Sequence, residues 1–356
     1  MFYLLNLIAV PIYYLLCMAL FCKHKANNVF ITIACIHAIL FRCFANPLNY
    51  VDTEGYAKAF AYLGEISLQE SLTSVYSSWG IGFVILNWIL SKFSTNYMVL
   101  FTFLSVVSVG GVFWFYKKTS YAFLITVLFY LSYPMLYYMG FGVVRHHFSI
   151  VFMLLALFFV DKFRVSVLFA LLGFSFHTSC IIFFPFYLWR IIKFERIKAF
   201  YTVLIAILGF FIMRLSMSYV LSYLPRYMDQ GFGEKGNSNI LPIFLIGSVL
   251  LLMYFSGTFR KLVTKREKNN FSFMTYGFMI SLFSFGLQGA GRLTLVFIYL
   301  LPVLISYLKR YSTPKILFYN MYVCIIGLLV CILIYISYTP VSYDYISVYE
   351  NVRVYK

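Results

Sequence analysis

Apolar runs of about 20 residues recur along the whole chain, separated by short polar segments. As a helix, each run is long enough to cross a hydrocarbon core of about 30 Å. The first run has no basic region before it and no small-residue cleavage site after it, which predicts a retained span rather than a signal peptide. The pattern predicts an all-α polytopic membrane protein, with residues 1–356 forming a single transmembrane domain. The predicted spans are 2–22, 28–45, 97–116, 120–139, 148–160, 199–220, 240–257, 272–287, 292–308 and 317–338.

Two further apolar stretches do not fit a simple count of crossings. Residues 79–93 (WGIGFVILNWILSKF) are short and contain glycine, and only one crossing fits between residue 78 and the Lys117/Lys118 cluster. We therefore predict a re-entrant or interfacial helix there. Residues 165–189 have basic clusters on both sides, which requires an even number of crossings, so two short helices are expected to meet near His177. The total is about 12 membrane segments, including short or re-entrant helices.

The distribution of charge sets the expected orientation. Hydrophobic residues make up 63% of the chain and charged residues only 11%, whereas soluble domains carry about 25% charged residues. A net charge of +17 could suggest nucleic acid, but the lysines and arginines form short clusters between spans, as cytoplasmic loops do. We expect contact with membrane lipids and no nucleic-acid partner. The loops 46–78 and 221–239 are then expected to face outward.

A few arginines lie inside the predicted spans or at their ends. Arg42 and Arg214 fall within spans, and Arg145 and Arg292 open spans after glycine-containing turns. An arginine within the bilayer costs about 2.5–3.5 kcal/mol on insertion scales, so each needs a reason. Snorkelling or ion pairing is one reason. The other is an anionic ligand, because guanidinium groups bind phosphate bidentately and stay charged.

Histidines provide a second set of candidates. His146 and His147 are adjacent, so on a helix they point about 100° apart and at most one is expected to serve a given site. His177, in the segment FSFHTS, lies at the predicted helix break. Its ring could be a buried neutral group that is satisfied by Thr178 or Ser179. Alternatively, it could take a proton from an attacking hydroxyl.

The chain shows no pattern that predicts a metal or cofactor site. Asp52 and Glu54 alternate in one loop, but no further ligand stands at a suitable spacing. The P-loop, the nucleophile elbow and the HExxH helix are all missing, which argues against ATP-driven transport and classical hydrolase chemistry. Tyrosines gather near the ends of spans, where interfacial anchoring is the expected role and sugar stacking the alternative.

Four short motifs resemble the EpsG-like branch of the Wzy-type O-antigen and capsular polysaccharide polymerases. That family has an arginine near the end of its second span, followed by an Asp and a spaced Tyr, which Arg42, Asp52 and Tyr56 resemble. Its pattern R-Q-x-x-A resembles the segment that begins at Arg145, although this chain has His146 where the family has Gln, and Ser149 in place of Ala.

The two remaining motifs lie further along the chain. The family phrase A-x-x-F-H-x-S resembles residues 173–179, with glycine at the alanine position and with His177 and Ser179 retained. A late arginine before an aromatic-rich span resembles Arg292. The likeness therefore extends over nearly the whole chain, although each motif is short.

The resemblance implies a metal-independent glycosyltransferase of GT-C-like architecture in the cytoplasmic (inner) membrane, with its active site facing the periplasm. Such an enzyme transfers a growing glycan from undecaprenyl pyrophosphate to the non-reducing-end sugar of a lipid-linked repeat unit. Its partners would be these undecaprenyl-pyrophosphate-linked donor and acceptor oligosaccharides and a chain-length regulator.

The resemblance also implies roles for individual residues. Arg145 and Arg292, with Arg42, would stabilise the leaving pyrophosphate. The first choice for the catalytic base is His177 and the second is Asp52. The outward loops, with their tyrosines, would hold sugars; the named sugar contacts are Trp79, Tyr56 and Gln288.

Four other functions remain open. An O-antigen ligase would use the same donor. A lipid-linked sugar flippase or transporter would also need arginines, but more often shows paired halves and deep acidic residues. A membrane O-acyltransferase would need an acyl-donor site open to the cytoplasm. A purely structural membrane protein would leave the arginines at glycine-containing turns unexplained.

Overall fold

The computed structural model describes residues 2–44, 52–133, 136–137, 139–192, 240–283 and 291–311. All regular elements in these ranges are helices, and none is a strand. This agrees with the predicted all-α fold. The described residues fall into two compact units, which divide between Cys180 and Ile181, and each unit is described separately.

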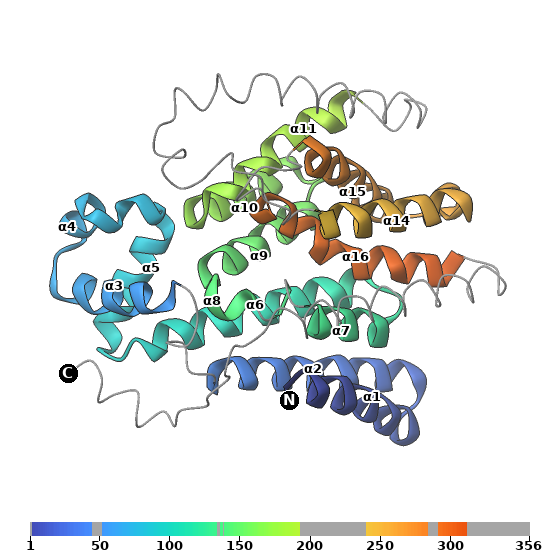
Figure 1. Ribbon diagram of the computed structural model, residues 1–356, viewed down its shortest axis with the longest axis horizontal. Coiled ribbons are helices and arrows are strands. Elements are labelled where there is room, and N and C mark those ends of the chain that lie inside the picture. Colours follow the sequence, from blue (N-terminus) through green and yellow to red (C-terminus); the bar gives the residue numbers. More distant parts are fainter. Residues whose placement is uncertain are drawn as a thin grey trace. The chain divides into compact units, whose positions relative to one another are not determined.

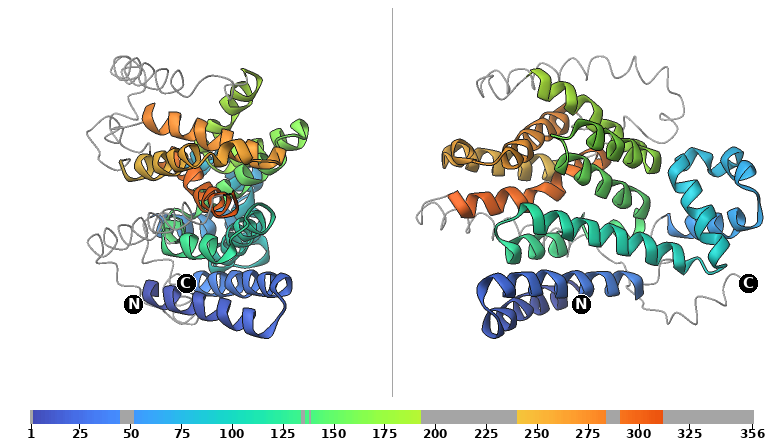
Figure 2. Two further views of the ribbon diagram at one scale, coloured as in Figure 1. Left: turned by 90° about the vertical axis from the view of Figure 1, so that its right-hand side faces the viewer. Right: turned by 180° about the vertical axis from the view of Figure 1, so that it is seen from behind.

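The first unit begins with a pair of apolar helices that lie side by side (Figures 1 and 2). These are α1 (Phe2–Leu20) and α2 (Lys23–Phe44), which closely match two predicted spans. Helix α6 (Met98–Thr119) packs against α2, and α7 (Phe123–Ser132) follows it. Helix α7 is shorter than the predicted span 120–139. It ends before Tyr133, whose backbone is extended because the next residue in the sequence is Pro134.

Residues 46–78, expected as an outward-facing loop, contain helices wherever they are described. These are α3 (Thr53–Glu65), α4 (Leu68–Thr73) and the 3-10 helix η2 (Val75–Trp79). Helix α3 buries one face, which includes Tyr56, Phe60 and Leu63. The segment is therefore an ordered cap of short helices packed on α5.

Both irregular stretches form short helices as predicted, and the re-entrant or interfacial position of the first stays a prediction. Residues 81–93 form α5 (Ile81–Phe93), which at 13 residues is about 20 Å long and too short to cross a bilayer alone. The stretch around His177 divides into α10 (Phe163–Phe176) and α11 (Phe183–Ile192), with the 3-10 helix η3 (Thr178–Ile182) between them. The predicted break at His177 is confirmed.

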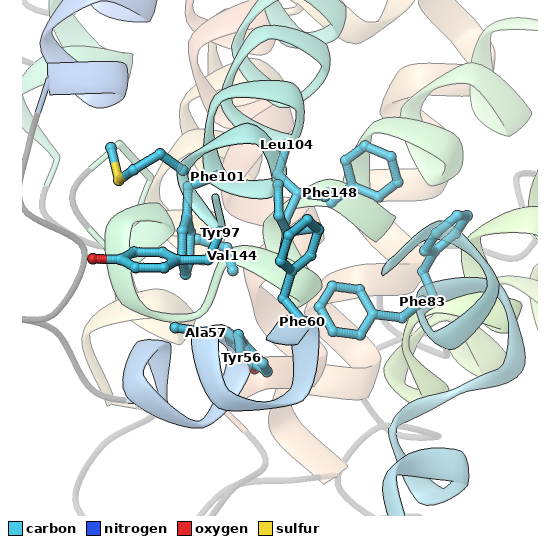
Figure 3. Packing of buried hydrophobic residues seen from close by; sticks show 12 residues of the cluster. Tyr56, Ala57, Phe60, Phe83, Tyr97, Phe101, Leu104, Val144 and Phe148 are labelled. Atoms are coloured by element: carbon cyan, nitrogen blue, oxygen red, sulfur yellow. The ribbon is translucent and has the colours of Figure 1, made fainter. Parts of the chain in front are cut away.

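A hydrophobic cluster holds the first unit together at the site described below (Figure 3). It joins α3, α5 and α6 to α10 and to α9 (Val144–Phe158), which packs closely on α6 and α10. Phe60, Phe83, Leu104 and Phe148 are all buried members of the cluster. The cluster fixes the first turn of α9 and the last turn of α10 relative to the helical cap.

In the second unit, three longer helices pack on one another. They are α14 (Ile240–Phe255), α15 (Lys265–Phe283) and α16 (Gly291–Tyr311), joined in part by the 3-10 helix η5 (Thr258–Lys261). Basic residues lie at the helix ends, as expected for clusters between predicted spans. They are Arg260 and Lys261 in η5, Lys265 at the start of α15, and Lys309 and Arg310 at the end of α16.

Three described helical segments are long and apolar enough to cross a membrane: Lys25–Phe44, Met98–Thr119 and Leu293–Tyr311. Five shorter apolar helices accompany them, and the chain is a membrane-embedded protein by this composition. The predicted spans 199–220 and 317–338 and the loop 221–239 lie outside the described residues. The total of about 12 segments and the outward orientation therefore stay predictions.

Candidate active site

Arg42 and the glycine-rich turn meet at the end of α2. Residues 139–142 form the short helix α8 (Met139–Gly142), and the non-helical residue Val143 separates it from α9. The guanidinium of Arg42 donates a hydrogen bond from Nη2 to the carbonyl of Gly140 and lies over the ring of Phe141. A Cβ atom at Gly140 would lie 2.7 Å from Nη1 of Arg42, so glycine is required for this approach.

The Arg42 guanidinium is buried with part of its hydrogen-bonding capacity unused. The side chain is only 4% exposed, and its Nε and Nη1 atoms have no hydrogen-bond partner among the described residues. No carboxylate in the described part of the chain pairs with it. An unsatisfied buried hydrogen-bond donor costs about 1–3 kcal/mol of stability, and a charged one costs more. Arg42 is therefore suited to bind an anionic ligand, which would satisfy these donors.

Arg145 lies in the first turn of α9, on the aromatic cap. Its Nη1 donates a hydrogen bond to the carbonyl of Trp79, and its guanidinium lies 5.8 Å from the ring centroids of both Trp79 and Phe83. These contacts orient a partly buried cation on aromatic faces. The structure thus brings together Arg145 and Trp79, two candidates that are 66 residues apart in the sequence.

Tyr56 supports Trp79 from the other side. The two rings meet edge to face at 5.1 Å, and Tyr56 also contacts Phe83 at 5.3 Å. The side chain of Tyr56 is 4% exposed and belongs to the hydrophobic cluster (Figure 3). Trp79, in contrast, is only partly buried. Of these two predicted sugar contacts, Trp79 therefore presents the accessible ring, and Tyr56 positions it.

His177 ends α10 in an extended conformation, and Ser179 fixes its ring. The Nδ1 atom lies 2.8 Å from the Ser179 hydroxyl and accepts the backbone N–H of Ser179 at 3.2 Å. Because an amide N–H only donates, the neutral ring that satisfies this contact carries its proton on Nε2. The ring of His146 stacks on that of His177 at 4.5 Å.

Two glycines bring the end of α10 against the start of α5. Gly80 has a positive φ of 101°, and a Cβ atom there would lie 2.6 Å from the carbonyl oxygen of Ser175. A Cβ atom at Gly82 would collide with the Ser175 side chain. Larger residues would separate the turn that carries Trp79 from the helix end that carries His177.

Asp52 immediately precedes α3 with an unusual backbone. Its φ is 71°, the only positive φ of a non-glycine among the described residues, and its exposed side chain makes no capping hydrogen bond to the helix. Aspartate tolerates this conformation better than most residues. Asp52 and Tyr56 are one helical turn apart, linked by the bond from Tyr56 N–H to the Asp52 carbonyl at 3.2 Å. The carboxylate is thus available for chemistry at the edge of the cap.

Three further candidates fall outside what the structure describes of this cluster. Arg292 lies in the first turn of α16, in the second compact unit, and its side chain is outside the description. Gln288 and Arg214 lie outside the described residues. No group of three His, Cys, Asp or Glu residues in the described ranges has an arrangement that would hold a metal ion.

Comparison with known protein families decides the membership of the chain. The model of the EpsG family matches residues 31–351. The chain belongs to the EpsG family. This membership and the apolar helices make the EpsG-family chain a membrane protein of polysaccharide biosynthesis. No curated protein and no solved structure matches it.

In this EpsG-family site, Phe83 was not singled out by the sequence, and the partners of the candidates His146 and His147 were not predicted. His146 replaces a glutamine of the family pattern, yet it stacks on His177, and its neighbour His147 is buried within electrostatic reach of Arg42 and His177. Phe83 supplies a second aromatic face to Arg145. The segments RHH (145–147) and FHTS (176–179) were both visible in the sequence, but they belong to different helices and nothing in the sequence paired them.

Proposed function

We propose that this EpsG-family protein is a polysaccharide polymerase. It transfers a growing glycan from undecaprenyl pyrophosphate to the non-reducing-end sugar of a lipid-linked repeat unit, at the outer face of the cytoplasmic membrane. We further propose about 12 membrane segments in a GT-C-like arrangement. The observation that carries the proposal is the buried Arg42, whose Nε and Nη1 have no hydrogen-bond partner among the described residues, in the same unit as Arg145, which lies over the Trp79 ring.

The arginines supply what the leaving group requires. When the acceptor hydroxyl attacks the anomeric carbon of the donor, the bond from that carbon to the pyrophosphate oxygen breaks and the electron pair stays on the pyrophosphate. Preorganised guanidinium groups stabilise such developing charge, and losing one donor of this kind costs about 10²–10³ in rate. Arg42 and Arg145 act here in our proposal, Arg292 keeps the same proposed role on the strength of the sequence motif alone, and no metal ion is needed.

The hydrogen bonds of His177 favour a role as a hydrogen-bond donor over the role of catalytic base, for which the sequence made it the first choice. Its Nδ1 lone pair is occupied by Ser179, so the neutral ring offers an Nε2–H to a phosphate oxygen. The proton of the acceptor hydroxyl then goes to Asp52, whose carboxylate is exposed and not used in capping α3. Assigning the base to Asp52 and the donor to His177 reverses the order that the sequence suggested.

Trp79 provides the sugar contact nearest to the arginines. Aromatic rings combine a large apolar face with little conformational freedom, which suits the apolar face of a pyranose. Trp79 is held by Arg145 on one side and by Tyr56 on the other. In this arrangement the sugar to be transferred lies on Trp79 while its pyrophosphate reaches the arginines.

The test is complementation of a strain that lacks its own polymerase, with surface glycan length read on a gel. Arg42→Ala and Arg145→Ala are expected to leave a single repeat unit on the acceptor, because export and ligation continue without polymerisation. Arg260→Ala, at an exposed helix end, is the matched control and should give normal ladders. Complete loss of surface glycan in the two variants would support a ligase or flippase instead, and normal ladders would refute the proposed role of both arginines.

A further inference from the structure

A line of aromatic rings leads away from Arg145 along the helical cap. Tyr62 of α3 contacts Tyr76 of η2 at 5.7 Å, and Tyr76 contacts Trp79 at 4.9 Å. Trp79 in turn lies beneath the Arg145 guanidinium. We call Tyr62, Tyr76 and Trp79 the aromatic ladder. Its inner end is part of the candidate active site, and its outer end, Tyr62, is 46% exposed.

The turn that carries the ladder is held rigidly by hydrogen bonds. Ser67 and Glu70 form a reciprocal cap at the start of α4, with bonds of 2.8 and 3.2 Å. The Ser67 hydrogen bonds lower the pKa of the Glu70 carboxyl, as expected for a carboxylate that accepts a backbone N–H in a capping box. The Ser74 hydroxyl accepts the backbone N–H of Tyr76 at 3.3 Å, and Lys92 binds the carbonyl of Gly64 at 2.8 Å. Such preorganisation reduces the entropy lost when a ligand binds.

The neighbourhood of the ladder combines two exposed apolar side chains, Val75 and Ile81, with a larger number of polar ones. Exposed side chains around it include carboxylates, an amide and hydroxyls, namely Glu65, Gln69, Glu70, Thr73, Ser77 and Ser78. Carboxylates are unfavourable in contact with lipid tails. Hydroxyls and amides beside one exposed and two partly exposed aromatic rings instead match a polymer whose units have one apolar face and a rim of hydroxyl groups.

We propose that the aromatic ladder is an extended glycan-binding subsite that retains the polymer between successive additions. Trp79 holds the sugar next to the reacting bond, and Tyr76 and Tyr62 hold sugars further along the same chain. This inference rests on the proposed polymerase function and adds a role to it, because residues remote from the reacting bond would set the length of the product. The occupant is the glycan portion of the substrate, since the ladder is continuous with the arginine site.

The test compares ring removal at the ladder with ring removal elsewhere. Tyr62→Ala and Tyr76→Ala are made beside Tyr62→Phe and Tyr76→Phe, which keep the rings. Tyr254→Ala is the matched control, because Tyr254 on α14 is 49% exposed and lies in the other compact unit. Glycan length is read at matched protein levels. Binding of the delipidated oligosaccharide to purified protein is followed by tryptophan fluorescence.

The two alanine variants are expected to add repeat units but to release shorter chains, with oligosaccharide affinity reduced about tenfold per ring. The phenylalanine variants and Tyr254→Ala should match wild type.

Full-length chains with unchanged affinity in the alanine variants would refute the proposed glycan-binding subsite. A common loss of membrane insertion in Tyr62→Ala, Tyr76→Ala and Tyr254→Ala, with affinity unchanged, would assign these tyrosines to lipid anchoring instead. If Arg145→Ala blocks polymerisation while the ladder variants resemble wild type, only the glycan-binding role of the ladder is refuted. If Arg145→Ala polymerises normally, the proposed function itself fails.

Discussion

Arg42 and Gly140 are in direct contact, although 98 residues separate them in the sequence. The guanidinium donates to the Gly140 carbonyl and occupies the space where a side chain at residue 140 would begin. Gly140→Ala should therefore displace Arg42 without removing it. Because a shift of about 1 Å in a catalytic group can cost about 10²-fold, we expect polymerisation to fall by about that factor, measured as repeat units added per unit time in membranes.

Gly110→Ala is the control for this substitution. Gly110 lies inside α6, and no atom lies within 4 Å of a Cβ placed there. Alanine in a helix interior is more favourable than glycine by about 0.8–1.0 kcal/mol, so this variant should be as active as wild type and at least as stable. Equal activity in both variants would show that the position of Arg42 is unimportant.

Arg145→Lys tests whether the shape of the guanidinium matters as well as its charge. The planar group lies over Trp79 and Phe83 while it donates to the Trp79 carbonyl, and an ammonium group cannot reproduce both contacts. We expect the lysine variant to lose about 10²-fold in rate, close to the loss in Arg145→Ala. Near-normal turnover in Arg145→Lys would reduce Arg145 to a simple positive charge.

His177→Gln separates a donor from a base. The glutamine amide N–H can take the place of Nε2–H, but an amide cannot accept a proton at neutral pH. If His177 donates to the pyrophosphate, the glutamine variant should keep about a tenth or more of the wild-type rate, whereas His177→Ala should lose about 10²-fold. Equally low rates in the two variants would restore His177 as the base.

Asp52→Asn tests the alternative base. Asparagine, like aspartate, tolerates the positive φ of residue 52, so the start of α3 should be unchanged. Removing a general base costs about 10²–10⁴-fold, and we expect a rate loss in that range with normal protein levels. Asp52→Gly, which also suits this backbone, should be equally inactive. An active Asp52→Asn enzyme would exclude Asp52 as the base.

The helical pattern and the break at His177 could be predicted because both follow from local sequence. Apolar run length defines α2 and α6, and the basic clusters on both sides of residues 165–189 required a division of that stretch. The helices of residues 53–79 were missed. They are short, and α3 buries a narrow face that includes Ala57 and Ala59, which a search for long apolar runs does not detect.

The pairings within the site could not be predicted, because they depend on long-range packing. Arg145 contacts Trp79 next to Gly80 and Gly82, which leave room for the end of α10. The sequence around these glycines does not indicate which segment packs against them. The stack of His146 on His177 likewise joins two helices. Residue types therefore indicated an anionic ligand, whereas the proposed division of roles between His177 and Asp52 needed the hydrogen bonds of Ser179.

The most direct test of the central claim is turnover by purified protein in lipid nanodiscs with a lipid-linked repeat unit as both donor and acceptor. Released undecaprenyl pyrophosphate and glycan length would be measured for wild type, Arg42→Ala and Arg145→Ala. We predict that wild type releases one undecaprenyl pyrophosphate for each repeat unit added, and that each arginine variant is slower by about 10²–10³-fold. Wild-type protein that releases no undecaprenyl pyrophosphate, or arginine variants that elongate at the wild-type rate, would contradict the account.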